Sequence, residues 1–284
     1  SEGIVTNTLG TSNFVAGVNA GNSITSGGNY NTVVGDEAGT AITTGDNNTA
    51  VGQDALKSTT TADHNTAVGQ AALYTNTTGT TNTAVGRASM YANTTGGANT
   101  AVGYAALNTN TTANNNTAVG YQSLQANTTG AGNVAVGRQA LLVNTTASSN
   151  TALGDQALNA NTTGASNTAV GSAALASNTT ASNNTAVGLN AMISNTTGPE
   201  NTAVGKSALL ANTTGGDNAA LGNDALSANT TGSHNVAIGD RALLSNTTAA
   251  YNTAVGDRSL RYNTTGVSNV GIGHYALNAN TTGG

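Results

Sequence analysis

Asparagines followed by two threonines carry the most evident chemistry in this sequence. Asn-x-Thr is the acceptor for N-linked glycosylation, and Asn-Thr-Thr occurs thirteen times at constant spacing from Asn76 to Asn280. The same regularity is typical of a buried ladder in which each amide hydrogen-bonds to the next. We favour the ladder, because the equivalent position holds Ile24 and Ile42 near the N-terminus, which indicates an inward-facing site. The better glycan acceptors are three asparagines outside this series: Asn47, Asn115 and Asn183.

No residue set predicts catalysis, a cofactor or a metal. The three histidines (His64, His234 and His274) lie in distant parts of the chain, so they do not form a ligand set. Asp36 and Glu37 are adjacent acids in a variable segment, which is typical of a solvated corner. Tyrosines are scattered and form no continuous row that would stack on sugars. The sequence therefore predicts a protein that is not an enzyme and holds no catalytic, cofactor or metal site.

The composition narrows the class of protein further. The 284 residues include seven Lys and Arg, twelve Asp and Glu, one Phe, no Trp, no Cys, one Pro and 37 Gly, with a net charge of -5. A chain this poor in basic residues is a poor partner for nucleic acid. No apolar run reaches the length of a membrane span. The core must be built from small residues, because large aromatic side chains are nearly missing.

A regular repeat organises the chain. Asn-Thr-Ala-Val-Gly or a near variant begins at Asn31, Asn48 and Asn65 and recurs at this spacing of seventeen up to Asn269, after an imperfect copy at Asn13. Numbered from this Asn, the consensus is Asn-Thr-Ala-Val-Gly-x-x-Ala-Leu-x-x-Asn-Thr-Thr-Gly-x-x. Sixteen units fill residues 13–284, and residues 1–12 form an N-terminal extension that we expect to cap the end or pair with a neighbouring subunit.

Two positions of the unit predict ladders of asparagine along the chain. Position 1 predicts a first Asn ladder at Asn48, Asn65 and Asn82. Position 12 predicts a second at Asn76, Asn93 and Asn110.

The repeat predicts an all-β fold. The unit is too short for a two-helix repeat, and Thr, Asn and Gly disfavour helix. The Asn-Gly pair of tight hairpins does not occur, so a chain that winds in one direction is favoured. The expected fold is a single β-solenoid, or β-roll, of about sixteen coils. With coils stacked about 4.8 Å apart, it would be a rod roughly 75 Å long.

Variation among the units predicts which positions face water. Every charge except Glu2 falls at position 6, 7, 10, 16 or 17. Aliphatic residues at positions 4 and 9 predict core ladders, and strand alternation then places the small residue at position 8 outward. Arg at this position, as at Ala106, Ala140 and Ala174, should split any side-by-side assembly. The predicted core ladders are Val51, Val68 and Val85 at position 4 and Leu56, Leu73 and Leu107 at position 9.

Glycine at position 5 is invariant and predicts a corner with positive φ or a close backbone approach. Position 15 accepts Ala in several units, so Ala at Gly137 should cost more than Ala at Gly130. The predicted corner glycines include Gly52, Gly69, Gly86, Gly103, Gly120 and Gly137.

The run Asn-Thr-Ala-Val-Gly-x-x-Ala-Leu-x-x-Asn-Thr-Thr-Gly resembles the repeats of bacterial surface and tail-fibre-like proteins. It is also similar to the head repeats of trimeric autotransporter adhesins. The resemblance implies a left-handed coil and an extracellular location, as a fibre or adhesive stalk. Two hypotheses follow. One is a structural fibre that self-associates head to tail through uncapped coil ends, and sideways as well. The other is an adhesin that binds a glycan or a surface, with ice binding by Thr-rich faces less favoured.

Overall fold

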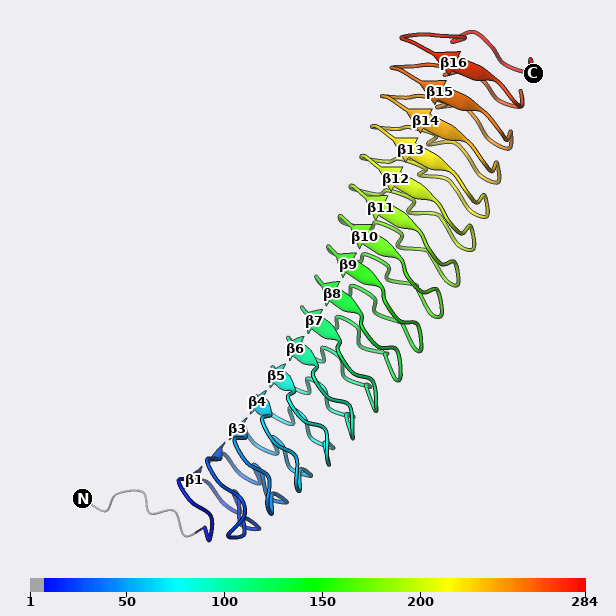
Figure 1. Cartoon of the computed structure of the whole chain (residues 1–284). Helices are drawn as coiled ribbons and strands as arrows, with labels where there is room; N and C mark the ends of the chain where they lie inside the picture. The colour runs from blue at the N-terminus through cyan, green and yellow to red at the C-terminus, as the bar shows by residue number, and fades with distance from the viewer. Residues whose placement is uncertain (1–7) are drawn as a thin grey trace. The chain divides into compact units, whose positions relative to one another are not determined.

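The computed structural model describes residues 8–284, which form a parallel β-solenoid without helices. The chain winds in about fifteen turns, and equivalent residues of successive turns are about seventeen positions apart, which confirms the predicted fold class. It divides into two compact units, Ser1–Gln139 and Ala140–Gly284, and each unit is itself a solenoid (Figure 1). No helix in the described part of the chain is long and apolar enough to cross a membrane.

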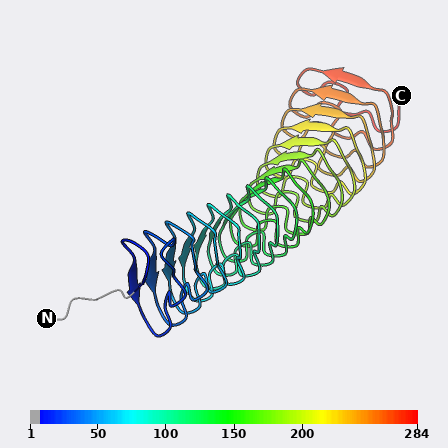
Figure 2. The same ribbon diagram turned by 60° about the horizontal axis from the view of Figure 1, so that its bottom comes forward.

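Each coil, which is one repeat unit, contributes a short strand at positions 2–4. In each unit these strands stack in sequence order as parallel neighbours (Figures 1 and 2). Val68 pairs with Val85 across one such step. The first unit contains β1 (Phe14–Ala16), β2 (Thr32–Val34), β3 (Thr49–Val51), β4 (Thr66–Val68), β5 (Thr83–Val85), β6 (Thr100–Val102), β7 (Thr117–Val119) and β8 (Val134–Val136). The second contains β9 (Thr151–Leu153), β10 (Thr168–Val170), β11 (Thr185–Val187), β12 (Thr202–Val204), β13 (Ala219–Leu221), β14 (Val236–Ile238), β15 (Thr253–Val255) and β16 (Val270–Ile272).

The strands are short because each coil turns at several left-handed residues. The glycine at position 5 has a φ of 128° at Gly86, and positions 7, 9 and 17 hold non-glycine residues with positive φ. In the coil that contains β6 these are Ala105 (51°), Leu107 (51°) and Asn115 (61°). A left-handed non-glycine residue is strained, so the coil-to-coil bonds must hold it in place. Consecutive residues from position 6 to position 11 therefore do not alternate between inside and outside.

The corner glycines behave as predicted. All six have a φ between 128° and 138°. A Cβ on Gly86 would lie 2.5 Å from the carbonyl oxygen of Gly103 in the next coil, so backbone also approaches closely there. Both reasons for glycine, conformation and space, thus apply at this corner.

The core differs from the prediction at two positions. Alanine at position 3 is fully buried, while Val51, Val68 and Val85 at position 4 are only half-buried on the outer side of the sheet. The prediction of a Val ladder in the core was therefore wrong. Strand alternation holds, but it places the small residue inside, where the buried leucines of position 9 also lie. Leu56, Leu73 and Leu107 are fully buried, as predicted.

The alanine at position 8 is the second correction. Ala106, Ala140 and Ala174 are fully buried, not outward, so they cannot mediate a lateral contact. The left-handed residues at positions 7 and 9 flank this alanine, and the chain turns so that positions 8 and 9 are both buried. Arg at Ala106 would break the coil rather than an assembly.

The described part of the N-terminal extension already follows the coil pattern. Ser12 has the positive φ of position 17, at 58°. The amide of Tyr30 donates to the carbonyl of Thr11 at 3.0 Å, and the amide of Thr11 donates to Asn29 Oδ1 at 2.8 Å. Bonds of the same kind join positions 16 and 17 in later coils. Thr8–Ser12 is thus the closing part of a preceding turn, and the predicted role of residues 1–7 lies outside the described residues.

Candidate functional site

The most distinctive chemical feature of the molecule is a pair of buried asparagine ladders. In the first ladder, at position 1, the backbone amide of Asn48 donates to Asn31 Oδ1 at 2.9 Å. The Asn48 Nδ2 atom donates to the carbonyl of Ala62, at position 15 of the same coil, at 2.8 Å. Each side chain therefore closes its own coil and accepts a bond from the following one. Asn48, Asn65 and Asn82 are fully buried, which confirms this ladder.

The second ladder, at position 12, joins side chain to side chain. Asn93 Nδ2 donates to Asn76 Oδ1 at 2.8 Å and to the carbonyl of Gly96 at 2.9 Å. Asn110 Nδ2 repeats both bonds with Asn93 and Ala113. Asn76, Asn93 and Asn110 are fully buried, as are the later members of the Asn-Thr-Thr series up to Asn263, so these amides form a structural ladder that is closed to a glycan.

The position 12 ladder begins at a defined place. Asn76 Nδ2 donates to the hydroxyl of Thr59, which occupies position 12 one coil earlier and is also buried. Before Thr59 the ladder gives way to Ile42, and a Cβ on Gly39 would lie 2.9 Å from the Ile42 Cδ1 atom. In this coil the large apolar side chain is at position 12 instead of position 9, and the glycine at position 9 leaves space for it. A hydroxyl suits the junction, because it both donates and accepts.

The three predicted glycan acceptors lie on the surface. Asn47, Asn115 and Asn183 occupy position 17, are exposed, and have φ values of 58°, 61° and 62°. Asparagine tolerates this conformation better than most residues, which gives a structural reason for its use there. Glycosylation of these side chains stays a prediction.

Threonines at positions 13 and 14 have different environments. The hydroxyl at position 13 donates to the carbonyl of position 13 in the next coil, as from Thr94 to Thr111 at 3.0 Å. Thr95 and Thr112, at position 14, are exposed. The two threonines of each pair therefore do not form one shared outward rank.

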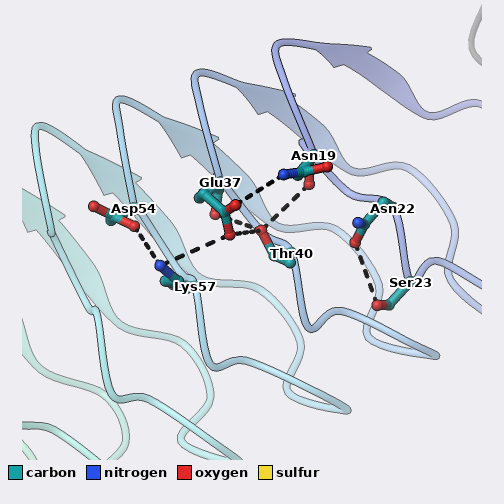
Figure 3. A network of polar contacts seen from close by, with 7 residues as sticks. All are labelled: Asn19, Asn22, Ser23, Glu37, Thr40, Asp54 and Lys57. Carbon is teal, nitrogen blue, oxygen red and sulfur yellow. Dashed lines mark hydrogen bonds and ion pairs between the residues drawn. The ribbon is translucent and has the colours of Figure 1, made fainter.

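Half-buried charged side chains form a local network on the coils of β1, β2 and β3 (Figure 3). Lys57 Nζ lies 2.8 Å from Asp54 Oδ1 and 3.7 Å from Glu37 Oε2. Glu37 in turn accepts a bond from Asn19 Nδ2 at 2.9 Å. The hydrogen bond to Asp54 is the main cause that raises the pKa of Lys57 above its usual value. Ion pairs that remain in contact with solvent add little stability, so this is a solvated strip rather than a reactive centre.

Aromatic residues pair between neighbouring coils, which the sequence pattern did not reveal. Tyr74 stacks on Tyr91 with ring centroids 4.9 Å apart, and Tyr104 stacks on Tyr121 at 5.4 Å. The Arg87 guanidinium lies over the Tyr104 ring at 5.7 Å. The two tyrosines of each pair occupy the same repeat position in successive coils. Because equal positions of successive coils are direct neighbours, this signal could have identified both pairs from the sequence.

Across residues 8–284, no three acidic or histidine side chains gather closely enough to hold a metal ion. Two histidines sit in surface clusters instead. His234 stacks on Tyr251 at 5.0 Å, and His274 Nδ1 lies 3.2 Å from Asp257 Oδ2.

A comparison with models of protein families finds none that matches this chain, and no curated protein matches it either.

Proposed function

We propose that this chain is a structural subunit of an extracellular fibre, extended by the stacking of one coil on another. The position 1 amide ladder and the strand bonds join coil to coil in both units, and from Asn76 onward the position 12 ladder joins them as well. The resemblance of the repeat to tail-fibre-like proteins and to adhesin heads supports an exported, elongated structural role. The proposal assigns no catalytic step and no cofactor to the chain.

The observation that carries the proposal is that successive coils are joined by the same groups, so a coil of one chain can stack on a coil of another copy in the same way. On the stacking face of the coil that contains β16, position 9 is Leu277, the equivalent of the fully buried Leu260 one coil earlier. Asn280 Nδ2 donates to Asn263 Oδ1 at 3.1 Å, so the acceptor for a following coil is Asn280 Oδ1. This face therefore offers apolar surface, a strand edge and an amide acceptor, which are the groups that a further coil uses.

Electron microscopy and light scattering of the purified chain test this proposal. The chain has a mass of 27.6 kDa, and we expect end-to-end particles whose mass rises with protein concentration. Leu277→Lys places a charge on the stacking face and should shorten them. Thr265→Lys places the same charge on an exposed position 14 and should leave them unchanged. Particles of one chain at every concentration would rule out stacking through this face.

The second candidate function is an adhesin or binding module for a glycan. The stacked tyrosine pairs favour it, because they place four aromatic rings on the surface of the first unit: Tyr74, Tyr91, Tyr104 and Tyr121. Stacking leaves ring edges and hydroxyls, more than open faces, for a sugar. Binding of soluble glycans that is lost in Tyr104→Ala would favour this function over the fibre.

A further inference from the structure

The outer face of the sheet in the second unit carries a continuous aliphatic rank. Position 4 points outward, and it is Leu, Val or Ile in every strand from β9 to β16. Leu153, Leu221 and Ile238 in this rank are 46%, 48% and 38% exposed. Beside it runs position 2, which is mostly Thr with Ala or Val substitutions. We call these two ranks the Thr/Val face.

The Thr/Val face is uncharged. No strand from β9 to β16 has a charged residue at position 2 or 4, and the charges lie at the corner positions instead. Parallel sheets are normally covered on both faces, and exposed apolar stripes of this length usually mark an interaction surface. One side of this sheet is covered by the solenoid's own core, and the Thr/Val face is the other.

We propose that the Thr/Val face of the second unit packs against the same face of a second copy. An uncharged face has no charge complementarity to offer an ionic partner, whereas it matches a copy of itself under two-fold symmetry. Both faces repeat at the same strand spacing of about 4.8 Å, so side chains interdigitate over their whole length. Two sheets packed in this way lie about 10 Å apart.

The available area is sufficient for a stable pair. Each strand offers roughly 100 Å² of outward Thr and aliphatic surface, so eight strands offer about 800 Å² per copy, the usual share of one partner in a standard-size interface. This lateral contact replaces the one expected at position 8, whose alanines are buried. It goes beyond the proposed fibre function, because it uses a side of the coil and not its end.

Light scattering tests the pair in a chain whose ends are blocked by Leu277→Lys. The expected mass is that of two chains. Adding Leu221→Lys and Ile238→Lys, in the adjacent strands β13 and β14, should reduce it to one chain, with a dissociation constant at least 100-fold higher. The matched control carries Thr231→Lys and Thr248→Lys, which add the same charge at exposed positions outside the Thr/Val face, and it should remain paired. Circular dichroism shows whether each variant is folded.

Several outcomes overturn the pair. One is a mass of one chain in the Leu277→Lys background, and another is a face variant that stays paired. A monomer that inhibits ice recrystallisation, and loses this activity with Leu221→Lys and Ile238→Lys, would assign the face to ordered water instead. Every variant in this test carries Leu277→Lys, so its mass does not depend on end-to-end stacking. If end-to-end stacking fails, only the result for the chain without Leu277→Lys changes, and the two proposals can therefore be rejected independently.

Discussion

Asparagine is suited to this core because its side chain is short and carries both a donor and an acceptor. At position 12 one amide group donates twice and accepts once, and all three bonds are buried. A serine hydroxyl has one donor hydrogen where the amide has two, and aspartate lacks the donor. Aligned amides polarise one another in a medium of low dielectric, which strengthens the ladder as a whole. The identity of the side chain is therefore more constrained than its burial alone requires.

Asn110→Asp tests this constraint at a single residue. The substitution keeps the shape but removes the donor, so Asn93 Oδ1 and the carbonyl of Ala113 lose their partner and face a buried carboxylate. We expect unfolding free energy to fall by at least about 3 kcal/mol at neutral pH. Burial raises the pKa of the new carboxyl, so the folded state binds more protons than the unfolded state, and stability should recover as the pH falls.

Urea unfolding at neutral and mildly acidic pH measures the effect. Asn115→Asp is the matched control, because position 17 is exposed and another coil already has Asp217 there. The control should change stability by less than about 0.5 kcal/mol. Equal losses in the two variants would contradict a special role for the buried amide.

At the scale of the coil, the sequence predicted the ladders and corners but placed the Val rank incorrectly. The regular Asn at positions 1 and 12 follows from bonds between equal positions, and that signal is readable without a structure. The choice between Ala101 and Val102 as the inward residue is not, because both are apolar and alternate. The inward residue is decided by the space that Leu107 and the asparagine side chains at positions 1 and 12 leave in the core. The left-handed turn at Leu107 is likewise hidden, since leucine gives no sign of positive φ.

Substitution of the two glycine positions tests the corner. Gly86→Ala must adopt a φ of 128° and would bring Cβ to 2.5 Å from the Gly103 carbonyl. A Cβ on Gly96, at position 15, would also lie close to backbone, 2.4 Å from the Ala113 carbonyl oxygen. The coil that contains Ala113 nevertheless accommodates alanine at this position, and no positive φ is required there. A small backbone shift therefore relieves the contact at Gly96 but not the conformation at Gly86.

We expect Gly86→Ala to cost about 2 kcal/mol or more in unfolding free energy, and Gly96→Ala clearly less. Thermal unfolding of the two variants compares them. A larger loss for Gly96→Ala would refute this account of the corner.

At the scale of the whole molecule, strands contact only the strands that precede and follow them within a unit. Stability in such a protein is a sum of terms between neighbouring coils, so a coil with one neighbour is the weakest. The amide of Gly273 donates to Val255 at 2.7 Å, and the amide of Gly205 donates to Val187 at 2.8 Å. The two bonds are equivalent, but only the first belongs to the coil whose core is exposed.

Hydrogen exchange should therefore distinguish these two amides. We expect Gly273 to exchange at least tenfold faster than Gly205 in dilute protein, because the coil of β16 opens without disturbing the others. Gly205 exchanges only when several coils separate. Mass spectrometry of peptides that cover the two strands measures the difference, and equal protection would show that the unit opens as a single block.

The amide ladders also bear on how such a gene can change. Because each rung makes the same bonds as the one before it, loss or gain of one whole repeat unit joins two compatible rungs. Residues 99–115, for example, could be removed and Asn116 would then meet Asn82 as Asn99 does now. Unequal recombination between repeated DNA would thus lengthen or shorten the protein without a folding penalty in the interior. The number of repeat units, and with it the length of the protein, can therefore change by mutation while each remaining coil keeps its fold.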